Sequence, residues 1–326
     1  MPVRAVHAVL ALASIAALGG CAELGVITDG TSVSYGKPSR GYLIDGVKLP
    51  DKGEGFTTRE VWAERGNRYG TEELVDLIKG VAKRMRGQVK DVRLVVADLS
   101  SNGGGAARKF HASHQSGRDA DLLYYMRDAE GRPFEADSMR VFDRALASKD
   151  KSGVTVDVPR TWLLVKELLT AQEATVQYIF MYQPIAQKVI EHAQAINEDP
   201  VIIARAIKAC RQPGDSAPHN DHMHVRIYCP IEDKQFGCVD IGPLDMLAER
   251  EAEKQRTLQT IADALPRGDE PPPAVVTATQ VWSGTMPAPA TMATANGAMA
   301  STNAPSASFS SLLRARADRI DLRGWR

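Results

Sequence analysis

Three histidines lie within the six residues from His219 to His224, and the segment that follows alternates polar with apolar side chains. In a β-strand, successive side chains point to opposite faces of the sheet. A strand over residues 223–228 therefore turns its methionine, valine and isoleucine toward a core and its polar residues the other way. His222 and His224 stand side by side on that polar face, an arrangement typical of two groups that serve one metal ion.

A second cluster, about a hundred residues upstream, contains His111, His114, Asp119 and Asp121. Five of the chain's seven histidines fall in these two clusters, beside carboxylates. An isolated histidine is usually a satisfied polar residue at the surface or at the edge of a core, but packing does not account for two dense groups. We therefore expect one metal site, which requires the two clusters to meet in space.

Histidine and carboxylate ligands suit zinc better than magnesium or calcium, which prefer shells of oxygen atoms. A catalytic zinc keeps three protein ligands and an open position for water. We expect His114, Asp121 and His224 to be these ligands. The spare imidazole of His222 then acts as general base toward the metal-bound water, whose pKa zinc lowers to about 7.

Two more histidines, His111 and His219, belong to the same clusters. Each is predicted to assist from outside the ligand set or to donate a hydrogen bond to the transition state, and either is able to take a fourth position on the metal. The His-Glu-x-x-His helix of common metalloproteases does not occur in the sequence, so no glutamate base of that kind is available.

The order of predicted elements indicates an α+β fold with a small, mainly antiparallel sheet flanked by helices. Thr71 is a good N-cap, acidic residues follow it, and apolar residues recur at helical spacing up to Gly87, where the helix is expected to stop. The glycine-rich segment 100–105 lacks a phosphate-binding motif and is expected to be a flexible loop beside the first histidine cluster. The predicted strands cover residues 92–99, 119–126, 175–182 and 223–228, and the other predicted helices cover residues 159–169, 184–196 and 201–210.

The first 21 residues have the features of a secretory signal peptide. Arg4 precedes an apolar run that is too short to cross a bilayer. The run ends in Leu-Gly-Gly before Cys21, which resembles a bacterial lipobox and predicts that Cys21 is acylated. An ordinary signal peptide with an incidental cysteine is the alternative. Stable attachment to a membrane needs more than one acyl chain.

The rest of the chain is predicted to hold one catalytic domain with additions at both ends. The Pro/Ala/Thr-rich stretch near the C-terminus has little from which to build a core. The arginine-rich residues after it either contact anionic envelope polymers or lipid, or form a solvated tail. The predicted segments are a tether and leading loop over residues 22–52, a zinc peptidase domain over 53–248, a helix over 249–264, a disordered low-complexity linker over 265–305 and a basic tail over 306–326.

Composition limits the possible partners of the protein, and its cysteines bear on the compartment in which it folds. The chain is 25% charged with no net charge, so it offers no basic field for nucleic acid. Export makes disulfides permissible. Cys229 and Cys238 bracket a short loop that contains Gly237, which predicts that they are bonded and that Cys210 is unpaired. Metal ligation by cysteine is the alternative, although no Cys-x-x-Cys spacing supports it.

Taken together, residues 111–121 and 219–230 resemble the paired motifs of the penicillin-insensitive murein endopeptidases. These enzymes belong to the group of lysostaphin, the D-Ala-D-Ala metallopeptidases and the hedgehog proteins. The group shares the pattern His-x6-Asp, which begins here at His114, and the pattern His-x-His, which begins at His222. The likeness extends over residues 69–238, roughly half of the chain.

The resemblance implies a zinc peptidase of the periplasm that cleaves the D-alanyl to meso-diaminopimelyl cross-link of peptidoglycan. It implies the ligands and the base named above, with His111 at the metal site and His219 as a catalytic helper. The chain departs from the family in its predicted lipid anchor on Cys21, its long C-terminal tail and its smaller set of cysteines. A D-Ala-D-Ala carboxypeptidase or dipeptidase of the same metal class is one alternative, and a non-catalytic wall-binding lipoprotein with a structural zinc is the other.

Overall fold

The computed structural model of the protein describes residues 32–106, 111–214 and 216–264. The chain divides after Ala248 into two compact units, and both histidine motifs belong to the first. The predicted signal peptide with Cys21, the low-complexity linker over 265–305 and the basic tail over 306–326 lie outside the described residues. Among the described helices, none combines the length and the apolar composition that crossing a bilayer requires.

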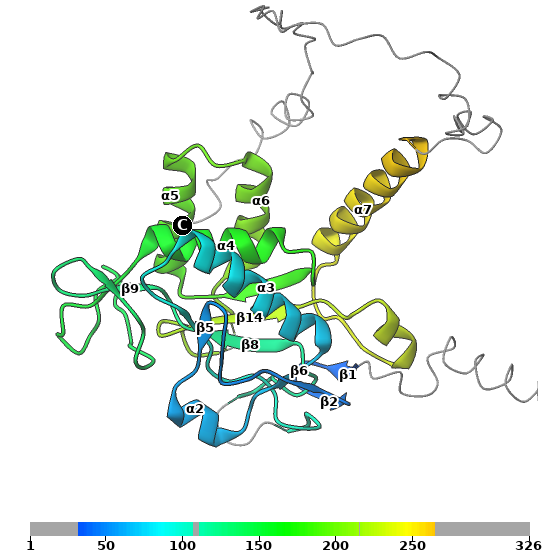
Figure 1. Ribbon diagram of the computed structural model, residues 1–326, viewed down its shortest axis with the longest axis horizontal. Coiled ribbons are helices and arrows are strands. Elements are labelled where there is room, and N and C mark those ends of the chain that lie inside the picture. The colour runs from blue at the N-terminus through cyan, green and yellow to red at the C-terminus, as the bar shows by residue number, and fades with distance from the viewer. Residues whose placement is uncertain (1–31, 107–110, 215, 265–326) are drawn as a thin grey trace, which may run out of the picture. The chain divides into compact units, whose positions relative to one another are not determined.

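A four-stranded sheet carries the motifs and confirms the predicted α+β fold. Its strands, in spatial order, are β13 (Cys210–Arg211), β12 (Val176–Phe180), β14 (Met223–Ile227) and β8 (Asp119–Leu122). Strand β14 runs antiparallel to both of its neighbours, whereas β13 runs parallel to β12. The strands that follow the two predicted motifs, β8 and β14, therefore lie side by side (Figure 1).

The apolar face predicted for β14 is confirmed as buried. Met223, Val225 and Ile227 are each 1% exposed or less, so one face of this strand packs on the core. Two other predicted strands are shorter in the structure. Residues 94–99 are buried, but only β7 (Leu94–Val95) is regular, and the segment 119–126 divides into β8 and β9 (Met126–Arg127).

Helices bury the apolar faces that their periodicity predicts. Thr71 accepts a hydrogen bond from Leu74 N and so caps α3, which continues one residue past the expected stop at Gly87. Helix α4 packs against α3, α5, α6 and β12 (Figure 1). The helices are α2 (Glu60–Arg65), α3 (Glu72–Gln88), α4 (Val158–Thr170), α5 (Gln183–Ala195), α6 (Pro200–Ala209) and α7 (Asp245–Ala264), which continues into the second unit.

Residues 32–52 differ from the predicted tether and leading loop, because they form strands that pack on the domain. Leu43 and Leu49 are 2% and 0% exposed, so this segment contributes to the core. Its glycines and serines hid the strand signal, yet Gly41 is required by close approach, because a Cβ there would lie 2.2 Å from Tyr35 O. The strands that begin in this segment are β1 (Val33–Lys37), β2 (Arg40–Ile44), β3 (Val47–Lys48) and β4 (Lys52–Gly53). Strands β5 (Phe56–Thr57) and β6 (Tyr69–Gly70) follow it and pair with β4 and β3.

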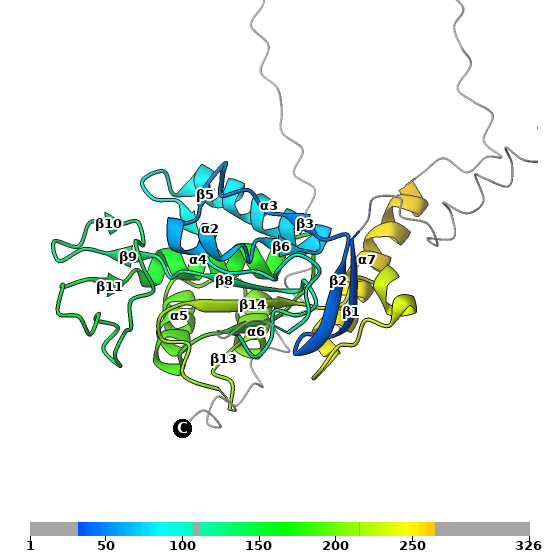
Figure 2. The ribbon, with the colours of Figure 1, turned by 90° about the horizontal axis from the view of Figure 1, so that it is seen from below.

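An arm between β9 and α4 was not predicted from the sequence. It contains a small sheet in which β10 (Pro133–Phe134) and β11 (Thr155–Val156) flank β9, and Figure 2 shows it extending to one side. Phe142 of the arm donates its backbone N–H to Asn220 O at 2.8 Å, and the Asn220 amide donates to Phe142 O at 3.3 Å. The arm thus holds the loop that carries His219 and His222.

A disulfide closes the turn after β14. Cys229 and Cys238 are bonded, as the sequence predicted, and Cys210 is free and buried. The enclosed turn contains the short helix η1 (Glu232–Phe236). Gly36 donates its N–H to Gly237 O at 3.0 Å, so the closed turn is hydrogen-bonded to β1.

Candidate metal centre

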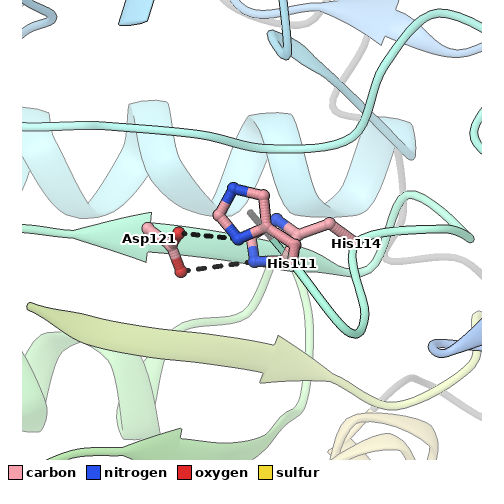
Figure 3. A group of neighbouring side chains, drawn as sticks. All are labelled: His111, His114 and Asp121. Atoms are coloured by element: carbon pink, nitrogen blue, oxygen red, sulfur yellow. Dashed lines mark ion pairs between the residues drawn. The ribbon is translucent and has the colours of Figure 1, made fainter. Parts of the chain in front are cut away.

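The register of β14 and β8 brings the two predicted motifs together. His224 pairs directly with Asp121 across these strands. His114 lies in the loop before β8 with a φ of 66°, a left-handed conformation that is uncommon for histidine. Figure 3 shows the rings of His111 and His114 beside the carboxylate of Asp121, with an ion pair to each.

Three atoms of the ligand type form a nearly equilateral triangle. His114 Nε2 is 3.2 Å from His224 Nδ1 and 3.3 Å from Asp121 Oδ1. His224 Nδ1 is 3.3 Å from the same oxygen. Ligands at the usual zinc distances of about 2.0–2.1 Å, arranged in a tetrahedron, are about 3.3–3.4 Å apart. The predicted ligand set therefore has the spacing of three tetrahedral zinc ligands.

The chemistry of these atoms also fits a cation. Asp121 is 0% exposed, and within the described residues neither of its carboxylate oxygens accepts a hydrogen bond. A buried carboxylate is costly unless it is hydrogen-bonded, paired or coordinated to a metal. The converging nitrogens and the unsatisfied oxygens are thus compatible with a metal ion.

His111 adds a further nitrogen at the edge of this set. Its Nδ1 is 3.6 Å from Asp121 Oδ2, and one ligand atom from each of His111, His114 and Asp121 lies within 4.8 Å of the others. Its Nε2 is 2.9 Å from Asp98 Oδ2, and Arg65 holds that oxygen at 2.7 Å. The histidine clusters indicated His111 but not Asp98, which lies in a separate buried segment.

His114 and His224 each have a second ring nitrogen that points away from the triangle. Each of these outer nitrogens lies near an oxygen atom. His114 Nδ1 is 3.1 Å from Leu99 O, and His224 Nε2 is 3.3 Å from Asp119 Oδ1. Outer oxygens of this kind fix the tautomer and orientation of a metal-binding imidazole. Arg226 donates two hydrogen bonds to the buried Asp119, at 2.7 and 3.0 Å. Asp119 lies on the strand predicted from the sequence, but its contact with His224 was not predicted.

His222 lies beside the triangle, with both ring nitrogens near carboxylates. Its Nε2 is 3.4 Å from Asp121 Oδ1, and its Nδ1 is 2.7 Å from Asp221 Oδ1. Burial lowers the pKa of His222, but Asp121 and Asp221 outweigh burial and raise this pKa to about 10. Burial raises the pKa of Asp121, but His114 and His222 hold it well below its usual range. A divalent cation beside Asp121 opposes this pull, because it repels an imidazolium and favours neutral His222.

His219 lies next to His222, with ring centroids 5.2 Å apart. Its backbone carbonyl accepts hydrogen bonds from Tyr124 Oη at 2.8 Å and from Tyr182 N at 3.0 Å. Burial, followed by the nearby His224 and His222, lowers the pKa of His219 to about 4. His219 is therefore a neutral imidazole at neutral pH, and one of its ring nitrogens is available as a donor.

An aromatic side chain that the sequence motifs did not indicate packs against this side of the site. Phe180 pairs with His224 across β12 and β14. The Phe180 ring lies 5.5 Å from that of His224 and 6.1 Å from that of His219, measured between centroids. No motif in the sequence marks it, because its position depends on strand pairing.

Comparison with known proteins places the motifs in a family. A family model described as penicillin-insensitive murein endopeptidase matches residues 34–279, which is more than half of the chain. The chain belongs to the penicillin-insensitive murein endopeptidase family. The match includes both histidine motifs and most of β1, so the resemblance stated from the motifs is confirmed.

Two curated relatives carry the same description. The penicillin-insensitive murein endopeptidase of Haemophilus influenzae is 29% identical over 209 residues, which cover 63% of this chain and 66% of that protein. The penicillin-insensitive murein endopeptidase of Escherichia coli O17:K52:H18 is 28% identical over 208 residues, which cover 62% of this chain and 69% of that protein. The similarity thus spans about two thirds of each relative.

Proposed function

We propose that this protein is a zinc metallopeptidase that hydrolyses the D-alanyl to meso-diaminopimelyl cross-links of peptidoglycan. The observation that carries the proposal is the triangle of His114 Nε2, Asp121 Oδ1 and His224 Nδ1, whose sides of 3.2 and 3.3 Å suit tetrahedral zinc. Membership of a family named for murein endopeptidases supports peptidoglycan as the substrate class.

In this proposal, His114, Asp121 and His224 hold the zinc ion, and His111 is near enough to take a further position. Nitrogen and carboxylate donors favour zinc over magnesium or calcium. When bound, zinc supplies a Lewis acid that polarises the scissile carbonyl and lowers the pKa of water to near neutrality. The outer contacts of Asp98, Asp119 and Leu99 O keep the imidazoles oriented.

His222 is the proposed general base. Asp221 fixes the ring through Nδ1 at 2.7 Å, which leaves Nε2 on the side of Asp121. A base in this position accepts a proton from the attacking water and then delivers it to the departing amine. Partly buried His219 remains neutral because its pKa is about 4, and its ring N–H is suited to donate a hydrogen bond to the carbonyl oxygen as negative charge develops there.

We propose a periplasmic location, with a membrane anchor through an acylated Cys21, peptidoglycan as the partner and no nucleic acid. The family supports action on the cell wall, and the lipobox-like sequence before Cys21 supports the anchor. Mass spectrometry of the mature N-terminus tests the anchor. An unmodified terminus beyond Cys21 would contradict it.

Digestion of purified cross-linked muropeptides tests the reaction. The wild-type protein is expected to convert dimers to monomers by cleavage of the D-alanyl to meso-diaminopimelyl bond, as identified by mass spectrometry. The Asp121→Asn variant, which keeps the size of a proposed ligand but removes its charge, should leave the dimers intact. Release of terminal D-alanine from monomers would instead indicate a carboxypeptidase, and binding without cleavage would indicate a wall-binding protein.

A further inference from the structure

The outward face of the β1–β2 hairpin has an unusual composition for a surface ribbon. In an antiparallel pair, directly opposite residues point to the same side. The exposed side of this hairpin consists of three such pairs, here called the hairpin face: Val33 with Ile44, Tyr35 with Tyr42 and Lys37 with Arg40. Figure 2 shows the hairpin as a separate ribbon beside the domain.

Burial does not account for the two exposed tyrosines, and strand pairing does not account for the two opposed cations. Tyr35 and Tyr42 are 48% and 60% exposed with ring centroids 6.4 Å apart, whereas the solvated face of a sheet is normally polar. Like charges directly opposite each other, such as Lys37 and Arg40, are destabilising. Within the described residues, no carboxylate pairs with either cation. Residues that depart from the usual composition of a sheet surface, with no contact that offsets the cost, are expected at functional sites.

The opposite side of the hairpin lies on the segment that follows His114. Gln115 donates its backbone N–H to Pro38 O at 3.0 Å, and Arg118 Nε donates to Ser34 Oγ at 3.1 Å. Arg118 and Ser34 are both 0% exposed. The hairpin is thus joined through buried contacts to the loop that carries a proposed zinc ligand, so a polymer on its outer face stays close to the site.

We propose that the hairpin face docks the peptidoglycan polymer outside the cleavage site. The two tyrosine rings provide flat apolar surfaces with polar tips, which suit the faces of sugar rings in the glycan strand. Lys37 and Arg40 provide cations for the free carboxylates of the stem peptides. This inference rests on the proposed function for the identity of the polymer.

The repeating chemistry of peptidoglycan makes it a better ligand for the hairpin face than a membrane surface. Two cations alone attract an anionic membrane only weakly. A polymer presents many copies of the same sugar and carboxylate, so a weak contact on the hairpin face raises the local concentration of cross-links at the active site. Anionic lipid is accordingly the competing occupant that the experiment must distinguish.

The test measures binding and cleavage separately with the full chain. Two double variants are made, Tyr35→Thr with Tyr42→Thr and Lys37→Thr with Arg40→Thr, because threonine preserves the strand preference. Binding to intact sacculi is measured in a His222→Ala background, which limits digestion. We expect each double variant to bind sacculi about tenfold more weakly. The same double variants are also made with native His222, and their kcat/KM on a small soluble muropeptide dimer should change less than about twofold.

Controls separate docking from misfolding and from lipid binding. Ile196→Thr and Lys149→Thr change exposed side chains elsewhere and should bind sacculi normally. Unchanged sacculus binding in both double variants would overturn the proposal, as would an equal loss on the small dimer or tighter binding to phosphatidylglycerol vesicles than to sacculi. If neither the wild type nor any variant cleaves muropeptides but the double variants still lose sacculus binding, the proposed reaction is wrong and the docking role of the hairpin face is supported.

Discussion

Asp119 Oδ1 lies 3.3 Å from His224 Nε2, and the other oxygen of the same carboxylate accepts the backbone N–H of His114 at 3.0 Å. One buried carboxylate therefore positions a residue from each histidine motif, and Arg226 holds it in place. Asp119→Asn replaces one acceptor oxygen by an NH₂ group and removes the charge. We expect its affinity for zinc to fall by about 10- to 100-fold, measured by competition with a chelator.

A matched control for this substitution is Asp91→Asn, because Asp91 also pairs with an arginine, at 3.2 Å, but is exposed on the surface. Its zinc affinity should equal that of the wild type. Equal zinc affinity of wild type and Asp119→Asn would show that the contact with His224 does not orient a ligand.

His222→Ala separates the proposed base from the proposed ligands. We expect kcat to fall by about 10²- to 10⁴-fold, because a general acid–base group contributes that much. Zinc content, measured by elemental analysis, should stay at the wild-type level. His192→Ala in α5 is the matched control and should retain activity. Loss of zinc from His222→Ala would make His222 a ligand, and unchanged hydrolysis would remove it from the base role.

Asp233 provides a pH dependence of stability. It is 3% exposed, its Oδ2 accepts Ser34 N–H at 2.7 Å, and burial is the main cause that raises its pKa to about 6. Because the folded pKa exceeds the unfolded value, the folded state binds the proton more tightly. The stabilising contribution is full below about pH 4 and is lost as the pH rises through about 6.

Asp233→Asn keeps an acceptor for Ser34 N–H but cannot ionise. Relative to wild type, its free energy of unfolding should increase by about 2 kcal/mol between pH 4 and pH 7. Urea unfolding at both pH values measures this difference. A difference that is independent of pH would mean that Asp233 ionises in the folded protein as readily as in the unfolded chain.

The disulfide between Cys229 and Cys238 should stabilise the first unit. It closes a short loop, for which the loss of chain entropy in the unfolded state corresponds to about 2–3 kcal/mol. The double variant Cys229→Ser with Cys238→Ser should melt at a lower temperature than wild type under oxidising conditions. Cys210→Ser alters the free cysteine and provides the control for reductant effects. Equal melting of the disulfide variant and wild type would refute this contribution.

Local patterns were sufficient to predict the elements that carry the site. The alternation after His222 predicted β14 and its buried face, and Thr71 predicted the start of α3, because both signals reside in neighbouring residues. The paired motifs predicted which side chains converge. The register that sets His224 opposite Asp121 could not be derived in the same way, because strand pairing depends on the whole fold.

The residues that the sequence did not reveal are those whose roles depend on distant contacts. Asp98 lies next to His111 only after a buried segment folds under the histidine loop. The β1–β2 hairpin was missed because glycine and serine weaken the strand pattern, although Leu43 packs in the interior. Phe142 donates a backbone hydrogen bond to Asn220 O, and a bond of this kind leaves no trace in side-chain patterns.

Zinc titration of the metal-free protein tests the proposed centre most directly. Hydrolysis of a cross-linked muropeptide dimer should be absent after zinc is stripped, rise in proportion to bound zinc and stop rising at a single ion per chain. His224→Ala should bind zinc weakly and remain inactive throughout the same titration. Full hydrolysis by the stripped protein, or a rate that does not follow the amount of bound zinc, would contradict a catalytic metal site at His114, Asp121 and His224.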